Sequence, residues 1–156
     1  MEENKQNHIE LIARAVVIDN NAILLCRPKA GDYYYFPGGH VDFDEDSVTA
    51  LKRELKEEAD VDVSETRFIG VWENSFFQNS FHKQPEQKHE LNLLFEAKLA
   101  SSDIKNMEDH IESGWVSLEE FKKARVLPVL LKEKIIQWMK DKEMFFGSEK
   151  DGTRIA

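Results

Sequence analysis

Short apolar, β-branched runs punctuate the chain, and each of them predicts a β-strand. They lie at residues 13–18, 22–26, 68–72 and 89–99. Residues 19–21, Asp-Asn-Asn, are turn formers and make the first two runs a hairpin. Residues 75–88 are mostly polar and predict a loop, whose length is typical of functional or disordered segments. The pattern therefore predicts one hairpin near the start and two later strands joined by a long loop.

A spacing of three to four residues between apolar side chains begins after Asp46 and predicts a helix over residues 46–59. Its apolar stripe consists of Val48, Leu51, Leu55 and Ala59. Ser117 and Glu120 form a capping box, which predicts a short helix through about residue 124. Pro128 predicts the start of a longer helix. The apolar face of that helix consists of Leu131, Ile135, Trp138 and Met139.

Helices inserted between sheet segments predict an α/β layered sandwich. The 156 residues fit one compact domain and show neither repeats nor an interdomain linker. From about Gly147 the chain is polar, so we expect a frayed, flexible end there.

The composition of the chain argues against several classes of function. The net charge of −9 argues against binding to a nucleic-acid polymer, which requires Lys and Arg on the phosphates. A small anionic ligand remains compatible if a metal ion supplies positive charge. The single Cys26 lies in an apolar run and favours a reducing compartment. The first residues lack the apolar core of a secretory signal, and no apolar run reaches the length of about 20 that spans a bilayer, so we expect a soluble cytoplasmic protein.

The helix over 46–59 concentrates acidic side chains beside its apolar stripe. At about 100° per residue, Glu54, Glu57 and Glu58 project within one sector of roughly 100°. Glu54 and Glu58 repel each other at i,i+4, and acids near a helix C-terminus oppose the helix dipole. A bound Mg²⁺ or Mn²⁺ would reverse the sign of these terms, because hard cations take oxygen ligands.

The alternative for the same helix is a solvated acidic face, softened by Arg53–Glu57 and Lys56–Asp60 pairs at i,i+4. The preceding loop favours the metal site over this alternative. Gly38-Gly39 permits a sharp bend that turns a backbone group towards a ligand, and Glu45 and Asp46 stand at the start of the helix.

Residues 39–61 resemble the Nudix box, G-x5-E-x7-R-E-U-x-E-E-x-G-U, in which U is a bulky aliphatic residue. The matching residues are Gly39, Glu45, Arg53, Glu54, Leu55, Glu57, Glu58 and Val61. Asp60 stands where the box has glycine, a position that ends the helix in a left-handed conformation and that Asp tolerates at modest cost. The resemblance implies a Nudix-type α/β/α sandwich with a mixed central sheet, in one Nudix hydrolase domain over residues 1–156.

The resemblance also implies roles. Glu54, Glu57 and Glu58 would bind Mg²⁺ or Mn²⁺ together with the backbone carbonyl of Gly38. Arg53 would orient a glutamate and Glu45 would brace the loop. Cleavage of a diphosphate needs neutralised oxygens and a nucleophilic water, and clustered metals supply both. The catalytic set is completed by a general base, for which Glu58 and three acids of a later loop are the candidates. The loop acids are Glu108, Asp109 and Glu112.

Substrate contacts are expected from residues around the glycines and from the aromatic runs. The set consists of Arg27, Tyr35, Gly39, His40 and Phe77. Arg27 would meet a terminal phosphate. The aromatics at 33–35, 76, 77 and 81 offer a stacking surface for a base or, alternatively, fill a core. Some Nudix subfamilies carry a proline or a tyrosine where Phe76 and Phe77 stand, so the ADP-ribose and dinucleoside-polyphosphate marks are both lacking.

The expected function is hydrolysis of a nucleoside diphosphate linked to another group, first of all a nucleoside triphosphate or oxidised nucleotide. ADP-ribose or a nucleotide sugar is the alternative substrate. A sensor that binds a nucleotide without turnover and an acidic interaction domain are the alternatives from other classes. The expected partner is a small-molecule nucleotide rather than a nucleic-acid polymer or a membrane, and the protein is expected to be a monomer or homodimer.

Overall fold

The computed structural model describes residues 7–80 and 83–155. Its elements, in chain order, are β1 Glu10–Val16, β2 Ile18–Asp19, β3 Ala22–Pro28, β4 Gly38–His40, α1 Ser47–Ala59, β5 Val63–Ser80, β6 Lys83–Leu99, β7 Ile111–Ser117, α2 Leu118–Lys123, α3 Val129–Asp141 and β8 Phe145–Ile155. No helix among these is long and apolar enough to cross a membrane.

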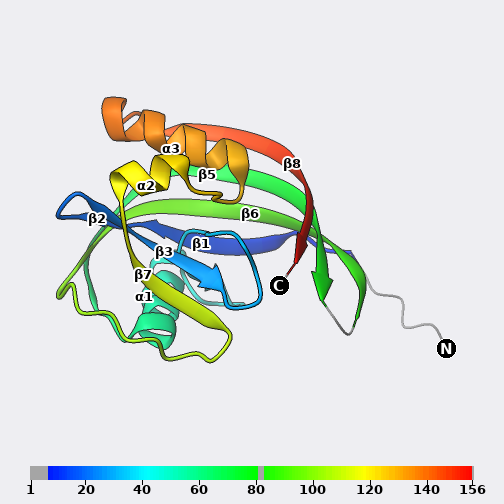
Figure 1. Ribbon diagram of the computed structural model, residues 1–156, viewed down its shortest axis with the longest axis horizontal. Helices are drawn as coiled ribbons and strands as arrows, with labels where there is room; N and C mark the ends of the chain where they lie inside the picture. Colours follow the sequence, from blue (N-terminus) through cyan, green and yellow to red (C-terminus); the bar gives the residue numbers. More distant parts are fainter. Residues whose placement is uncertain (1–6, 81–82, 156) are drawn as a thin grey trace.

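The strands form two sheets. One has five strands in the order β4-β1-β6-β5-β8, and the other has three in the order β2-β3-β7. The larger sheet is mixed, because β1 runs parallel to β6 and β5 runs parallel to β8, whereas β5 and β6 are antiparallel. Figure 1 shows β5, β6 and β8 as long curved ribbons lying side by side.

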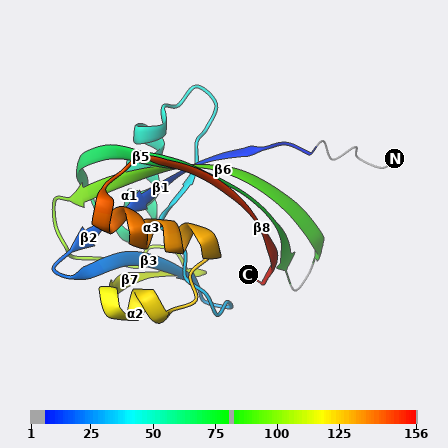
Figure 2. The same ribbon diagram turned by 90° about the horizontal axis from the view of Figure 1, so that it is seen from above.

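Two apolar clusters hold the layers together. One joins Leu51 and Leu55 of α1 to small side chains of β1 such as Ala13. The other joins α2 and α3 to the opposite faces of the sheets, with Phe121 and Ile135 fully buried. Helices therefore cover both sides of the strands, as Figure 2 shows from above. The expected α/β/α sandwich with a mixed central sheet is confirmed.

The three predicted helices are present, and Ser117 caps α2 as expected. Asp46 accepts a hydrogen bond from Thr49 N at the start of α1, and Ser117 accepts one from Glu120 N at the start of α2. Helix α3 begins directly after Pro128. Asp60 ends α1 in the left-handed conformation, with φ 53° and ψ 41°, as expected for the residue that replaces the box glycine.

The prediction of a loop over residues 75–88 is wrong. Strands β5 and β6 extend into it and pair with each other, with Ser75 opposite His89 and Phe77 opposite Gln87. Two residues close to the ends of this segment, Asn74 and Glu90, are polar but buried. They therefore interrupt the alternation of apolar and polar residues that would have predicted longer strands. Phe81 lies outside the described residues.

The first hairpin is shorter than predicted. In it Ile18 lies opposite Ile23 and Asp19 opposite Ala22, around Asn20 and Asn21 with φ of 52° and 63°, as a two-residue hairpin turn requires. Strand β1 belongs instead to the larger sheet.

The carboxyl end also differs from the expectation of a frayed tail from Gly147. Residues 145–155 form β8, which extends the larger sheet beside β5. The Glu149 carboxylate accepts hydrogen bonds from Trp72 Nε1 at 3.0 Å and from Leu130 N and Leu131 N at 3.1 Å. These bonds tie the strand to the first turn of α3, which has no side-chain cap of its own.

Candidate active site

Two adjacent glycines in β4 bring the backbone against β1 and against α1. Gly38 has φ of +140°, and a Cβ there would meet the Ala13 carbonyl group and come within 3.0 Å of Arg14 Cα. A Cβ on Gly39 would lie 2.5 and 2.6 Å from the carboxylate oxygens of Glu54. Both positions therefore require glycine, the first for the backbone and the second for the placement of a carboxylate.

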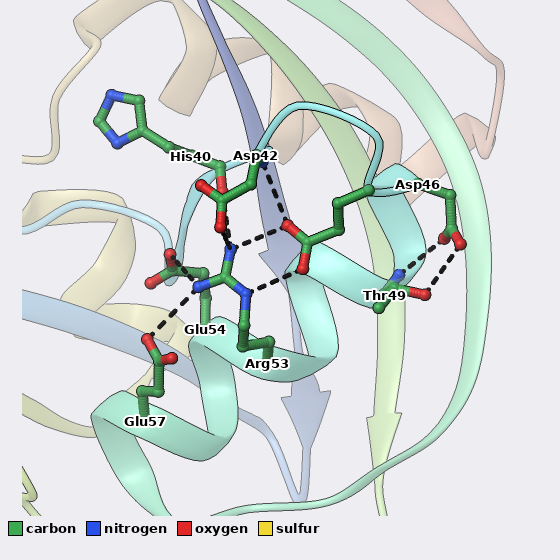
Figure 3. A network of polar contacts seen from close by, with 8 residues as sticks. His40, Asp42, Asp46, Thr49, Arg53, Glu54 and Glu57 are labelled. Carbon is green, nitrogen blue, oxygen red and sulfur yellow. Dashed lines mark hydrogen bonds and ion pairs between the residues drawn. The ribbon is translucent and has the colours of Figure 1, made fainter.

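Arg53 joins the loop to the helix. Its Nε and Nη2 donate to the two carboxylate oxygens of Glu45, each at 2.9 Å, and Nη2 also donates to the His40 carbonyl at 3.0 Å. Nη1 donates to Glu54 at 3.0 Å and to Glu57 at 3.4 Å. Figure 3 shows the guanidinium at the centre of this network. The hydrogen bonds from Arg53 lower the pKa of Glu45 and keep that carboxylate ionised.

Glu58 is the most deeply placed acid of the helix, with 7% of its surface exposed. Burial raises its pKa to about 8; the negative charges of Glu54 and Glu108 act in the same direction, and Arg14 and the Gly38 N–H oppose them. Burial likewise raises the pKa of Glu54, whose side chain is 17% exposed. Two acids that are costly to ionise therefore lie close together.

The donor set suits a hard divalent cation, because three carboxylates emerge from one helix face and two of them are held away from bulk water. Their side chains do not converge in the present geometry. Over residues 7–80 and 83–155, no three His, Cys, Asp or Glu side chains form a ready metal cluster. The reason is that Arg53 holds Glu54 and Glu57, while Glu58 faces Cys26 Sγ at 3.9 Å and the Gly38 N–H.

Glu54 and Glu58 line one end of a cavity of about 550 Å³. Its wall runs from the glycines of β4 across the inner face of the larger sheet to β8, and it includes loop residues on either side. Aromatic and polar side chains make up much of the remainder, namely Arg14, Tyr33, Tyr35, Phe36, Phe76, Gln78, Glu90, Asn92, Glu108 and Arg154. A cavity of this size accommodates a small organic ligand.

Residues 10–139 match the family model described as the NUDIX domain. The chain belongs to this family. Nudix hydrolases act on pyrophosphate bonds, and they in general need divalent metal ions. The predicted enzyme class is thereby confirmed.

Solved structures share the fold. A mutator MutT protein from Bacillus halodurans has 17% identity over 92% of this chain and 90% of its own, with a TM-score of 0.75. An ADP-ribose pyrophosphatase from Streptococcus suis has 17% identity over 91% and 98%, with a TM-score of 0.61. A UDP-X diphosphatase has 13% identity over 90% and 68%, with a TM-score of 0.65.

The structure brings most of the Nudix-box residues together. Glu54, Glu58, Gly38 and Gly39 line the cavity, and Glu45 and Arg53 support them from outside its wall. Glu57 lies at the margin, with its side chain 52% exposed.

The sequence-predicted substrate and base residues divide into two groups. Tyr35, His40 and Glu108 line the cavity. A second group lies outside its wall and comprises Arg27, Phe77, Asp109 and Glu112. Arg27 donates to Glu112 at 2.8 Å and stacks over Tyr34, which removes both partners from the cavity. Phe77 points to the opposite side of β5 from Phe76 and is 48% exposed.

Several cavity residues escaped sequence reasoning, above all Arg14, Asn92 and Arg154. They sit on strands, where a polar side chain ordinarily indicates the solvent face. The signal that could have found them is the interruption of apolar alternation on neighbouring strands by polar residues.

Proposed function

We propose that the protein hydrolyses the diphosphate linkage of a small nucleotide in a metal-dependent reaction, with a nucleoside triphosphate or an oxidised form of one as the substrate. The observation that carries the proposal is the cavity, in which Glu54 and Glu58 lie at one end and aromatic and amide side chains line the rest. This combination suits a ligand with an anionic group at one end and a planar, polar group at the other.

Glu54, Glu57 and Glu58, with the Gly38 carbonyl, would hold Mg²⁺ or Mn²⁺. When bound, the ion would neutralise charge on the diphosphate oxygens and make a water more acidic. Arg53 keeps Glu54 in place and ties the glycine-containing loop to α1 through Glu45 and the His40 carbonyl. Arg53 is therefore a positioning residue. Positioning matters because catalysis requires the reacting atoms to lie within about 1 Å of their productive geometry.

Among the acids of the later loop, Glu108 is the best-placed general base, because it lines the cavity and acts electrostatically on both Glu54 and Glu58. It would take a proton from the attacking water as the water oxygen bonds to one phosphorus and the anhydride P–O bond breaks. The leaving phosphate or pyrophosphate carries away the bridging oxygen. Glu112 accepts a hydrogen bond from Arg27 instead, so a variant at Glu112 is the matched control for one at Glu108.

Two of the proteins with similar structures are an ADP-ribose pyrophosphatase and a UDP-X diphosphatase. ADP-ribose or a nucleotide sugar is therefore the second candidate substrate. We further expect action on free nucleotides rather than on polymers or membranes, by a monomer or homodimer in the cytoplasm.

The test is a panel of nucleoside triphosphates, ADP-ribose and nucleotide sugars, incubated with Mg²⁺ and with or without a chelator. Release of pyrophosphate supports a triphosphate substrate. Phosphate that appears only after added phosphatase, without pyrophosphate, identifies the ADP-ribose or sugar class. Tight binding of a nucleotide without turnover would favour the sensor and contradict the proposal.

Variants sharpen the test. Glu58→Gln and Glu108→Gln should each lower kcat by at least about 100-fold at saturating Mg²⁺, whereas Glu112→Gln should stay within about threefold of wild type. Near-normal turnover of Glu58→Gln would disprove the metal-site assignment, and equal effects of Glu108→Gln and Glu112→Gln would disprove the base assignment.

A further inference from the structure

The far end of the cavity is built by a strand that lies beyond the family match. The NUDIX model ends at residue 139, whereas β8 spans Phe145–Ile155. Strands β4 and β8 are the two edges of the five-stranded sheet, and the cavity reaches from Gly39 on the first to Arg154 on the second. Figure 1 shows β8 following the curve of β5 to the carboxyl terminus.

Arg154 is buried at this end, with 7% of its surface exposed. Its guanidinium carbon lies 3.7 Å from the centroid of the Phe76 ring, so the cation is held over the aromatic face. Phe76 is itself buried, and both residues line the cavity. The pair therefore presents a fixed, flat surface rather than a mobile surface charge.

Hydrogen-bonding groups surround this surface. Gln78 lies opposite Arg154 across the β5–β8 pair, and its amide nitrogen is buried without a hydrogen-bond partner among the described residues. Glu90 is buried 4.0 Å from Arg14, and the charges of Glu90 and Arg154 both act on Tyr33. Donors and an acceptor carboxylate are thus gathered at one end of a cavity, where each is costly to remove from water.

We propose that Arg154, stacked on Phe76, selects the base of the substrate, favouring a planar heterocycle whose edge carries a carbonyl oxygen beside a ring N–H, as in guanine, over adenine. The proposal rests on the proposed function for the placement of the phosphates near Glu54 and Glu58. Guanidinium N–H groups pair with a purine carbonyl and its neighbouring nitrogen, and a carboxylate such as Glu90 accepts from ring N–H groups. Adenine offers an amino group where guanine has the carbonyl.

A phosphate is the less suitable occupant of this end, because the buried Glu90 opposes an anion. The guanidinium of Arg154, with one face over Phe76, instead has in-plane N–H donors that suit the edge of a planar base. The edge contacts then decide between bases, so the specificity depends on the planar fork of Arg154 and not only on its charge.

The experiment compares kcat/KM for dGTP and dATP, with Mg²⁺, for wild type, Arg154→Gln, Arg154→Lys and Arg125→Gln. Arg125 is the matched control, because it too lies over an aromatic ring, that of Tyr33 at 5.9 Å, but it pairs with Asp32 and lies outside the cavity wall. Wild type should prefer dGTP by about tenfold or more. Both Arg154 variants should lose that preference, mainly through KM, and Arg125→Gln should keep it.

A second measurement does not depend on turnover or on a folded variant. Titration of the wild-type protein with GMP and AMP, without metal, should shift the Arg154 Nε–H resonance with GMP at lower concentration than with AMP. Shifts with GMP but no hydrolysis of any nucleotide would support the base site and overturn the proposed function. Hydrolysis with equal rates for the two bases, an unchanged preference in Arg154→Gln, or equal loss for both substrates would overturn the base site.

Discussion

Alanine substitution at the two adjacent glycines of β4 should distinguish effects on folding from effects on catalysis. The added methyl group would meet backbone atoms at Gly38 and a carboxylate at Gly39. At Gly38 the methyl group would be driven into the Ala13 carbonyl group, with φ at +140°. At Gly39 its three nearest atoms would be those of the Glu54 carboxyl group, the end of a flexible side chain. Gly38→Ala should therefore damage the fold, and Gly39→Ala should damage the reaction.

The magnitudes follow from these contacts. A non-glycine residue in the backbone conformation of Gly38 costs about 1–3 kcal/mol, and displacing the β1–β4 pairing costs about another 1 kcal/mol. A total near 3 kcal/mol lowers the melting temperature by about 6–12 °C for a chain of this length. Gly39→Ala should change the free energy of unfolding by less than about 1 kcal/mol, because the lost flexibility of the unfolded chain offsets movement of Glu54.

The activity of Gly39→Ala should nevertheless fall by about 100-fold, because a displacement of about 1 Å at a reacting centre has that effect. Thermal unfolding followed by circular dichroism and Mg²⁺-dependent pyrophosphate release measure the two quantities on the same samples. Equal loss of stability in both variants, or a fully active Gly39→Ala, would refute the placement of Glu54 over Gly39.

Further predictions concern the helix ends and the core. Asp60→Gly should raise the melting temperature by about 1–3 °C, because glycine relieves the left-handed backbone at φ 53°; an Asp60→Ala control should lower it. Glu149→Gln should cost about 1–3 kcal/mol, measured by urea unfolding, because the carboxylate caps α3 and accepts from Trp72, and an unchanged midpoint would contradict this. Burial raises the pKa of Cys26 to about 12, so at pH 8 only about one thiol in ten thousand is ionised; iodoacetamide should label the native protein far more slowly than the urea-unfolded one, and rapid native labelling would place Cys26 at the surface.

The sequence predicted those parts of the fold whose signals are local. Helix α1 was found because Leu51 and Leu55 repeat at helical spacing, and α2 because Ser117 and Glu120 cap it. The left-handed Asp60 followed from its place in the Nudix box. In each case the residues that decide the structure lie within a few positions of one another.

Strand β8 could not be predicted in this way, because its stability comes from distant partners. Residues 147–154 are polar and contain two glycines, a composition that ordinarily predicts a frayed end. Trp72 lies against Gly147, where a Cβ would come 2.6 Å from the indole Cη2, and bonds to Glu149. A contact between residues this far apart in the chain leaves no periodic signal.

Two errors of the sequence-based prediction, the loop over 75–88 and the frayed end from Gly147, share one physical origin, and both lie in the region of the proposed base site. Asn74, Glu90 and Asn92 turn inward and are buried, although polar residues on a strand ordinarily face solvent. A sheet that lines a ligand cavity reverses that rule, because its inner side chains must exchange water for the polar groups of a ligand rather than for apolar neighbours. The loop wrongly predicted at 75–88 and the frayed end wrongly predicted from Gly147 contribute Phe76, Gln78 and Arg154 to the cavity wall. Local rules therefore failed where the chain builds the end of the cavity farthest from the Nudix helix, as expected if selection there acts on ligand contacts rather than on the packing of a core.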